Sequence, residues 1–346
     1  MRALGRWLGR GALAILLVVA SLLAPVAYVE LACRGTPVEA AREPILPPEH
    51  RRPEARTLLT YPEWHIVHAY EDYAAVIGTG DPHEFRFLPA VAGFWSSLCG
   101  LSRAAPAHGG ADWETKQMLY VIGMSFTAEL FAKALYEETA GRVAAWARGP
   151  ERAPLDDLSA RQAADYAAFL RQVPWYRWDF RADAAALDAA AAGGLRDRER
   201  RLALGAEYRA KAMYADAIAA AVATMAPDEL SMRSVVRGLA PEELSAVEGV
   251  TVIAERPQGV EIETPRYAAF TAVAKEIAAR GADFVEIAGN DDIMLTALSD
   301  GPTDLGALAR LRRQPEGFRH LLLVPVAELA DRLRDPALAV EHVHDY

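Results

Sequence analysis

The feature that most constrains the fold of this 346-residue chain is an uncharged apolar stretch close to its N-terminus. Residues Gly11 to Val29 carry no charge and are rich in Leu, Val and Ala. This is about the length that crosses the hydrocarbon core of a bilayer as a helix. Arg2, Arg6 and Arg10 precede the stretch, and positive residues favour the cytoplasmic side. The sequence therefore predicts a transmembrane signal anchor over residues 1–33, with a short cytoplasmic N-terminus.

A cleaved signal peptide and a lipid attached to Cys33 are two alternatives to a transmembrane anchor. A cleaved signal peptide would need small residues at the cut, and Pro25 disturbs the sites after Ala24 and Ala27. A lipid attached to Cys33 is disfavoured because Glu30 occupies a position that prefers an aliphatic residue. An uncleaved anchor is the reading we adopt, and it predicts a bacterial inner-membrane protein that crosses once and has its C-terminal body in the periplasm.

The state of the two cysteines depends on the compartment that holds the body. An oxidising compartment would permit a bond between Cys33 and Cys99, and two unpaired small apolar residues are the alternative. The sequence leaves this pairing open.

Composition narrows the functional class. Hydrophobic residues make up 52% of the chain and charged residues 24%, which is typical of a globular protein. The net charge of −10 argues against nucleic acid as a partner, because phosphate binding needs a basic surface.

The body is expected to fall into three parts. Residues 34–59 hold prolines among charges and predict an extended linker that lifts the body off the membrane. Residues 60–226 carry helical periodicity, with Asp112 as the cap of a long helix. Residues 227–346 alternate short Val- and Ile-rich strands with short helices, and we find no internal repeat.

The last part has a recognisable order of elements. Residues 231–299 read as β-α-β-β-α-β-β, with the final two strands joined in a hairpin across Asn290 and Asp291. This order is close to a ferredoxin-like sandwich. The predicted fold class is therefore α+β: a transmembrane helix, a mostly α-helical middle domain and a C-terminal ferredoxin-like module.

The helix expected from Thr60 toward Gly78 holds the main candidate site. Thr60 and Glu63 have the spacing of a capping box. Beyond the cap, His65, His68 and Asp72 lie on one helix face on successive turns, as a metal site on a helix requires. The alternative is that the two histidines only hydrogen-bond to neighbouring helices or to water.

Further candidate binding residues fall into two groups. Glu129 and Lys133 are four residues apart in an apolar helix, which predicts a partly buried ion pair or a carboxylate for the metal. Aromatic residues cluster near residue 177 and predict core filling, an interface, or a stacking surface for a sugar. The candidates are Glu63, Trp64, Glu129, Lys133, Trp175, Tyr176 and Trp178. His342 and His344 also point the same way on the last strand, with Asp345 beside them. Two histidines at this spacing can share a metal, and the alternative is a solvated terminal strand.

No familiar catalytic motif is present. The sequence has no P-loop, no Gly-x-Ser-x-Gly elbow, no His-Glu-x-x-His and no Cys-x-x-Cys, and it identifies no cofactor. We therefore expect a membrane-anchored extracytoplasmic accessory or interaction protein that binds a protein partner in the envelope. The alternative is a metal- or haem-dependent enzyme or carrier that uses the face of His65, His68 and Asp72.

Overall fold

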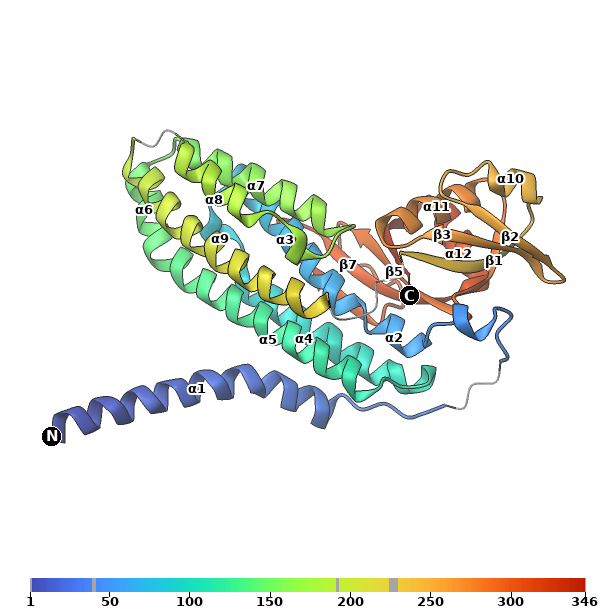
Figure 1. The fold of residues 1–346 in the computed structure, drawn as a ribbon, viewed down its shortest axis with the longest axis horizontal. Coiled ribbons are helices and arrows are strands. Elements are labelled where there is room, and N and C mark those ends of the chain that lie inside the picture. Colours follow the sequence, from blue (N-terminus) through green and yellow to red (C-terminus); the bar gives the residue numbers. More distant parts are fainter. Residues whose placement is uncertain (1, 39–41, 191–192, 224–229, 346) are drawn as a thin grey trace.

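The computed structural model describes residues 2–38, 42–190, 193–223 and 230–345. A long N-terminal helix leads to a bundle of helices, and two β-sheets form the C-terminal part (Figure 1). This arrangement confirms the α+β class.

The N-terminal helix α1 (Arg2–Ala32) contains the apolar stretch. Its segment Arg10–Ala32 is long and apolar enough to cross a membrane, and most of its described side chains are exposed. Trp113–Arg148 also has the length and composition of a span. A disulfide between Cys33 and Cys99 joins the residue after α1 to the bundle, so the pairing that the sequence left open is present.

The bundle is built around one helix, α3. It packs against α4, α5 and α7, so it has bundle neighbours on several sides. The bundle helices are α2 (Glu54–Leu58), α3 (Tyr61–Thr79), α4 (Phe87–Ala104), α5 (Trp113–Tyr136), α6 (Arg142–Arg148), α7 (Pro154–Leu170), α8 (Phe180–Ala189) and α9 (Leu195–Val222), with a π-helical turn at Glu137–Gly141.

The starts of two helices test the capping predictions. Asp112 is the expected cap of α5, and its carboxylate accepts from the Thr115 amide at 2.6 Å. The capping box at Thr60 and Glu63 is wrong. Because α2 already leads into α3, the Thr60 backbone is helical and its hydroxyl donates to the Thr57 carbonyl at 2.7 Å. A capping residue needs a non-helical backbone to turn its oxygen toward the helix.

Two antiparallel four-stranded sheets follow. Sheet A has the order β2-β3-β1-β4 and sheet B the order β6-β7-β5-β8. The strands are β1 (Ser231–Arg237), β2 (Thr251–Arg256), β3 (Gly259–Pro265), β4 (Asp283–Ile287), β5 (Asp292–Ser299), β6 (Ala309–Arg312), β7 (Phe318–Pro325) and β8 (Ala339–His344). The helices among them are α10 (Pro241–Ser245), α11 (Ala268–Ala279) and α12 (Val326–Arg334).

The two sheets repeat one plan. In each, the first strand lies between the third and the fourth, and the second strand is at the edge. Each also has a β-bulge where the first strand meets the fourth, beside Val235/Val236 in sheet A and Thr296/Ala297 in sheet B. The amino-acid sequence does not reveal this repeat, because the two sheets share topology and not residue identity.

The expected hairpin across Asn290 and Asp291 is wrong. β4 pairs with β1, and β5 pairs with β7 and β8, so the two strands belong to different sheets. Ala288 (φ 49°) and Gly289 (φ 87°) have left-handed backbone conformations at this point. The chain therefore turns out of sheet A and begins sheet B instead of folding back.

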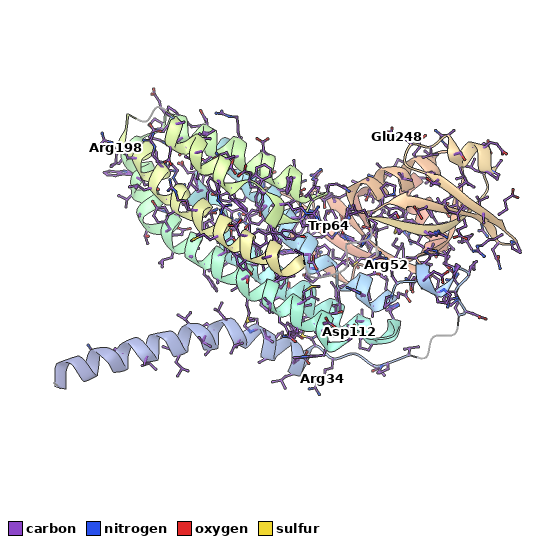
Figure 2. The ribbon with its side chains drawn as sticks, viewed as in Figure 1. Arg34, Arg52, Trp64, Asp112, Arg198 and Glu248 are labelled. Atoms are coloured by element: carbon purple, nitrogen blue, oxygen red, sulfur yellow. A yellow bond between two sulfur atoms is a disulfide. The ribbon has the colours of Figure 1, made fainter. Side chains whose placement is uncertain are left out.

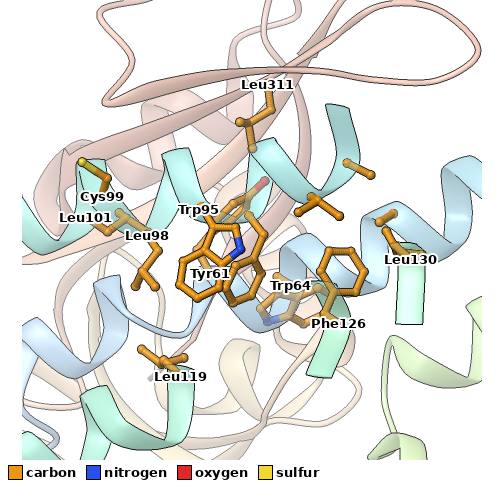
Figure 3. Close-up of a cluster of buried hydrophobic side chains, with 14 of the residues drawn as sticks. Tyr61, Trp64, Trp95, Leu98, Cys99, Leu101, Leu119, Phe126, Leu130 and Leu311 are labelled. Carbon is orange, nitrogen blue, oxygen red and sulfur yellow. The ribbon is translucent and has the colours of Figure 1, made fainter. Parts of the chain in front are cut away.

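Sheet B is buried on both faces. One face shares a hydrophobic core with sheet A, α11 and α12. The other face contributes Met294, Leu311 and Leu321 to the core of α3, α4 and α5. Figure 3 shows Leu311 beside the aromatic side chains of this core. Strands of this sheet therefore contact the bundle directly.

The linker between α1 and α2 packs against the body over part of its length. Glu286 of β4, fully buried, accepts hydrogen bonds from the amides of Ile45 and Leu46 at 2.6 and 2.7 Å and from the Arg42 guanidinium at 2.6 Å. Leu46 is itself fully buried. This part of the linker is thus held to sheet A and is not a free spacer.

Replacing Glu286 should release the linker. In Glu286→Ala the two linker amides lose their acceptor, so we expect a loss of about 1–3 kcal/mol in the free energy of unfolding. Tryptic cleavage at Arg42 and Arg51 should become faster in the folded protein. Glu276→Ala, which removes an exposed carboxylate of α11, serves as the control and should change neither quantity. Equal cleavage of both variants would contradict this account of the linker.

Candidate functional site

The polar residues of α3 meet sheet B. Trp64 lies where the bundle meets the sheets (Figure 2). His65, His68 and Asp72 are all buried, at 8%, 3% and 5% exposure. A buried polar group is costly without a partner, so the partners of these three residues define what the site can do.

Arg319 of β7 is the centre of the charged part of the site. Its guanidinium donates to Asp72 at 3.0 Å and to Glu341 at 2.8 and 3.1 Å, and it lies 3.5 Å from Glu71. The second Asp72 oxygen accepts from the Gln314 amide at 2.8 Å. Burial raises the pKa of Asp72, and the Arg319 charge opposes that rise. Asp72 is therefore part of an ion-pair network.

His68 is oriented by a carboxylate. Its Nδ1 lies 3.1 Å from Glu71, and since a carboxylate only accepts, Nδ1 carries the hydrogen and Nε2 keeps a lone pair in the neutral ring. Nε2 lies 3.7 Å from Glu341 and has no hydrogen-bond partner within the described part of the chain. Burial raises the pKa of Glu71, but its hydrogen bonds to His68 and Arg171 outweigh burial and lower it to about 2.

Two histidines of β8 complete a buried imidazole cluster. The His342 ring stacks on Trp64 with centroids 3.7 Å apart, and His344 meets the edge of Tyr61 at 5.3 Å. His342 Nδ1 is bonded to Thr271, but its Nε2 and both nitrogens of His344 have no partner among the described residues. Burial lowers the pKa of His342 to about 3 and that of His344 well below its usual range. These rings are therefore neutral and keep lone pairs.

A β-bulge brings Glu341 to this side of the sheet. Thr296 pairs with His342 and Ala297 pairs with Val340, so Glu341 is the extra residue between them. Without the bulge, strand alternation would turn Glu341 away from His342. This is why sequence reasoning found His342 and His344 but missed Glu341. Glu71 and Arg319 were missed because no pattern in the chain links them to His68.

The predicted metal ligands do not surround one point. The His65 Nε2 is bonded to the Ala90 carbonyl at 2.8 Å, and the ring lies against Phe94 and Phe126. Burial lowers the pKa of His65 to about 4. His65 thus faces α4 and α5, whereas His68 and Asp72 face sheet B. The group of His65, His68 and Asp72 stays a prediction, and Glu63 lies exposed on α3.

Within the described residues, two groups of ligand atoms lie within 4.8 Å of one another: His68, Glu71, Glu341 and Glu54, His108, Asp292. In the second group the hydrogen bond that His108 donates to the Glu54 carboxylate raises the pKa of His108. A raised pKa disfavours the neutral imidazole that a metal requires, so this group is better described as an ion pair. The first group is the stronger metal candidate.

Glu129 and Lys133 belong to a different buried network. The expected pair between them is wrong: Lys133 bonds Glu207 at 2.9 Å, and Glu129 bonds Lys211 at 2.7 Å. Lys211 also lies 3.1 Å from Glu207. The reason is that α9 brings its own charges against α5, which spacing within one helix cannot reveal. Burial raises the pKa of Glu207, but Lys133 and Lys211 outweigh it and lower the value to about 2.

The aromatic cluster mostly fills a core. Phe180 is buried, and Trp175, Tyr176 and Trp178 are partly buried against the core of α7, α8 and α9. The Trp178 indole donates to Asp183 at 2.6 Å. Core filling, one of the three readings of this cluster, therefore accounts for most of its surface.

Comparisons with protein-family models, with curated proteins and with solved structures each found no match.

The buried histidines should make stability depend on pH. Because the pKa values of His65, His342 and His344 are lowered by folding, the unfolded chain binds more protons below pH 6.5. Their contribution to stability is present above about pH 6.5 and is lost as the pH falls toward 4, by up to about 1.4 kcal/mol per pH unit for each histidine. Buried Asp72 and Asp345, with raised pKa values, act in the opposite direction.

Two variants measure the contribution of His344 to the pH dependence of stability. Urea unfolding of the full chain between about pH 7 and pH 5 should show a shallower pH dependence in His344→Leu than in the unmodified chain. His50→Gln, which removes a histidine outside the cluster, should keep the original slope. An unchanged slope in His344→Leu would mean that this ring is not neutral in the folded state.

Proposed function

We propose that the chain is a membrane-anchored accessory protein of a bacterial inner membrane, with its body on the periplasmic side, that binds another envelope protein. The observation that carries the proposal is the exposed apolar helix α1 fixed to the body by the Cys33–Cys99 disulfide. Disulfides persist in oxidising compartments such as the periplasm. An exposed helix of this length and composition is best satisfied by lipid.

The strand order supports a finer reading of the C-terminal part. We infer that β1 to β4 with α10 and α11 form a ferredoxin-like unit. The order β2-β3-β1-β4 and the antiparallel pairing support it. That fold hosts many unrelated functions, so it favours none.

Two edge strands of the sheets are poor docking sites for a strand of a partner. Edge strand β2 has a bulge at Ile253, and edge strand β6 has only four residues, both of which discourage pairing with another strand. A cleft of about 540 Å³ at the far end of the bundle is a better surface for a partner. Trp146 lines it and is 83% exposed, beside Arg142 and Arg152. Trp and Arg are the residues that most often dominate binding energy at interfaces.

The partner should depend on Trp146. Purification of the full chain in gentle detergent after crosslinking should recover a partner in stoichiometric amount. Trp146→Ala should lower that yield at least about tenfold, because truncating a hot-spot residue costs about 2 kcal/mol or more. Leu202→Ala, at an equally exposed apolar residue of α9, should retain the yield. Isolation as a lone monomer in every detergent would contradict the proposal.

A metal-binding function is the second candidate, and the group of His68, Glu71 and Glu341, with the neutral rings of His342 and His344 near it, favours it. Glu71 holds His68 in the tautomer that presents Nε2, as carboxylates do for metal-bound histidines. Neutral imidazoles and a carboxylate are ligands that suit Zn²⁺ and other transition metals. Arg319 opposes this function, since its charge already neutralises Glu341.

The metal content of the purified protein distinguishes the metal-binding function from the interaction function alone. Untagged full-length protein should contain about one equivalent of a transition metal if the second candidate holds. His68→Asn, which removes a proposed ligand, should then weaken binding of added Zn²⁺ by at least the about 10- to 100-fold that loss of an outer-shell partner costs, and His50→Gln should not. Less than about a tenth of an equivalent, unchanged after metal supplementation, would leave the interaction function alone.

A further inference from the structure

Exposed arginines gather at the hairpin between β6 and β7. They are Arg86, Arg310, Arg312 and Arg313, and each of these residues is exposed. The guanidinium groups of Arg310 and Arg312 lie 5.6 and 5.9 Å from the centre of the Phe318 ring. Because a cation is attracted to the face of an aromatic ring, Phe318 holds two of these charges close to the hairpin.

Gln314 brings Arg86 to the same hairpin. The Arg86 amide donates to Gln314 Oε1 at 2.7 Å, and Gln314 Nε2 donates to the Arg86 carbonyl at 3.3 Å. Gln314 directly follows Arg313 in the hairpin. Two segments that are distant in the sequence therefore contribute to one surface, which we call the arginine surface.

The arginine surface has an excess of positive charge. Among the described residues, none of its four arginines lies within ion-pair distance of a carboxylate, and Arg310 donates to the Pro302 carbonyl at 3.1 Å. The exposed acids of this region are Glu316 in the hairpin and Asp304 before β6, so two carboxylates stand against four guanidinium groups. The whole chain has a net charge of −10, which makes a local positive excess notable.

An exposed apolar residue and the cleft at Trp146 adjoin the arginine surface. Leu88, in the first turn of α4, is 59% exposed and follows Arg86 by two positions. His83 and Glu84, which line the cleft, directly precede this segment. Protein interfaces are enriched in arginine and in large apolar residues, which is the combination present here.

We propose that the arginine surface binds an acidic segment of the partner protein that the cleft at Trp146 receives. A guanidinium group donates paired N–H bonds to a carboxylate, so an arginine cluster suits a segment rich in Asp and Glu. Charges at the rim of an interface speed association and select the partner. The inference rests on the proposed interaction function and adds the chemistry of the partner.

The neighbouring cleft favours a protein over a lipid headgroup as the source of the anionic groups. A headgroup would satisfy the arginines alone. A protein segment would engage the arginines, Leu88 and the cleft together, and a second contact on the same molecule strengthens the first.

A polyglutamate peptide tests the chemistry directly. Its binding to the full chain in detergent is followed by fluorescence anisotropy at low salt. Arg312→Gln/Arg313→Gln should weaken binding at least about threefold, because each exposed ion pair contributes modestly. Added salt should reduce the difference between this variant and the unmodified chain. The control is Arg161→Gln/Arg198→Gln, which removes two exposed arginines of α7 and α9 and should leave binding unchanged.

Three results would overturn the inference. The first is an absence of peptide binding to the unmodified chain, and the second is equal weakening in both double variants. The third is quenching of a dye on Glu316→Cys in nanodiscs of phosphatidylglycerol that carry a quencher on the headgroups, because the arginine surface would then face the membrane. The native cysteines are bonded to each other, so this label is specific.

Recovery of the crosslinked partner separates this inference from the proposed function. Loss of the partner in both Trp146→Ala and Arg312→Gln/Arg313→Gln supports the inference. A partner that is lost in Trp146→Ala but retained in the arginine variant rejects only the acidic segment. Absence of a partner in every detergent rejects the proposed function and the inference with it.

Discussion

The buried guanidinium of Arg319 is the interaction on which the assembly of the body depends. It binds Asp72 of α3 and Glu341 of β8, so one cation links the bundle to both a central strand and an edge strand of sheet B. Removing one member of such a group leaves uncompensated charge in a dry interior, which costs about 3–5 kcal/mol.

The contact between α3 and sheet B also explains why His65, His342 and His344 stay neutral. Burial disfavours charge on His342 and His344, and the nearby cation adds to the effect of burial on His65. Glu71 and Glu341 pair with Arg319, and Glu71 also accepts from His68 Nδ1. His342 and His344 are thus uncharged nitrogen bases beside an ion-pair network, and they have the chemistry of either a packed core or a metal shell.

Local patterns in the sequence predicted local structure well. The apolar N-terminal helix, the helix at residues 61–79, the Asp112 cap and most strands were predictable because each depends on residues within a few positions. The pairing partners were not. Lys133 pairs with Glu207 and not with Glu129, and β5 joins a second sheet, because these outcomes depend on which elements meet in space. At the site, the sequence identified His68, Asp72, His342 and His344. The position of Glu341 depends on a β-bulge, which no residue pattern indicates.

The repeated plan of the two sheets has a consequence for how the molecule is put together. The residue before each bulge, Val235 or Thr296, faces Glu286 in sheet A and His342 in sheet B. The same position in the topology is therefore occupied by different residues. In sheet A it is Glu286, which accepts from the linker amides, and in sheet B it is His342, which stacks on Trp64. The two sheets share one topology, yet each binds a different segment of its own chain. Sheet A binds the linker, and sheet B binds the bundle.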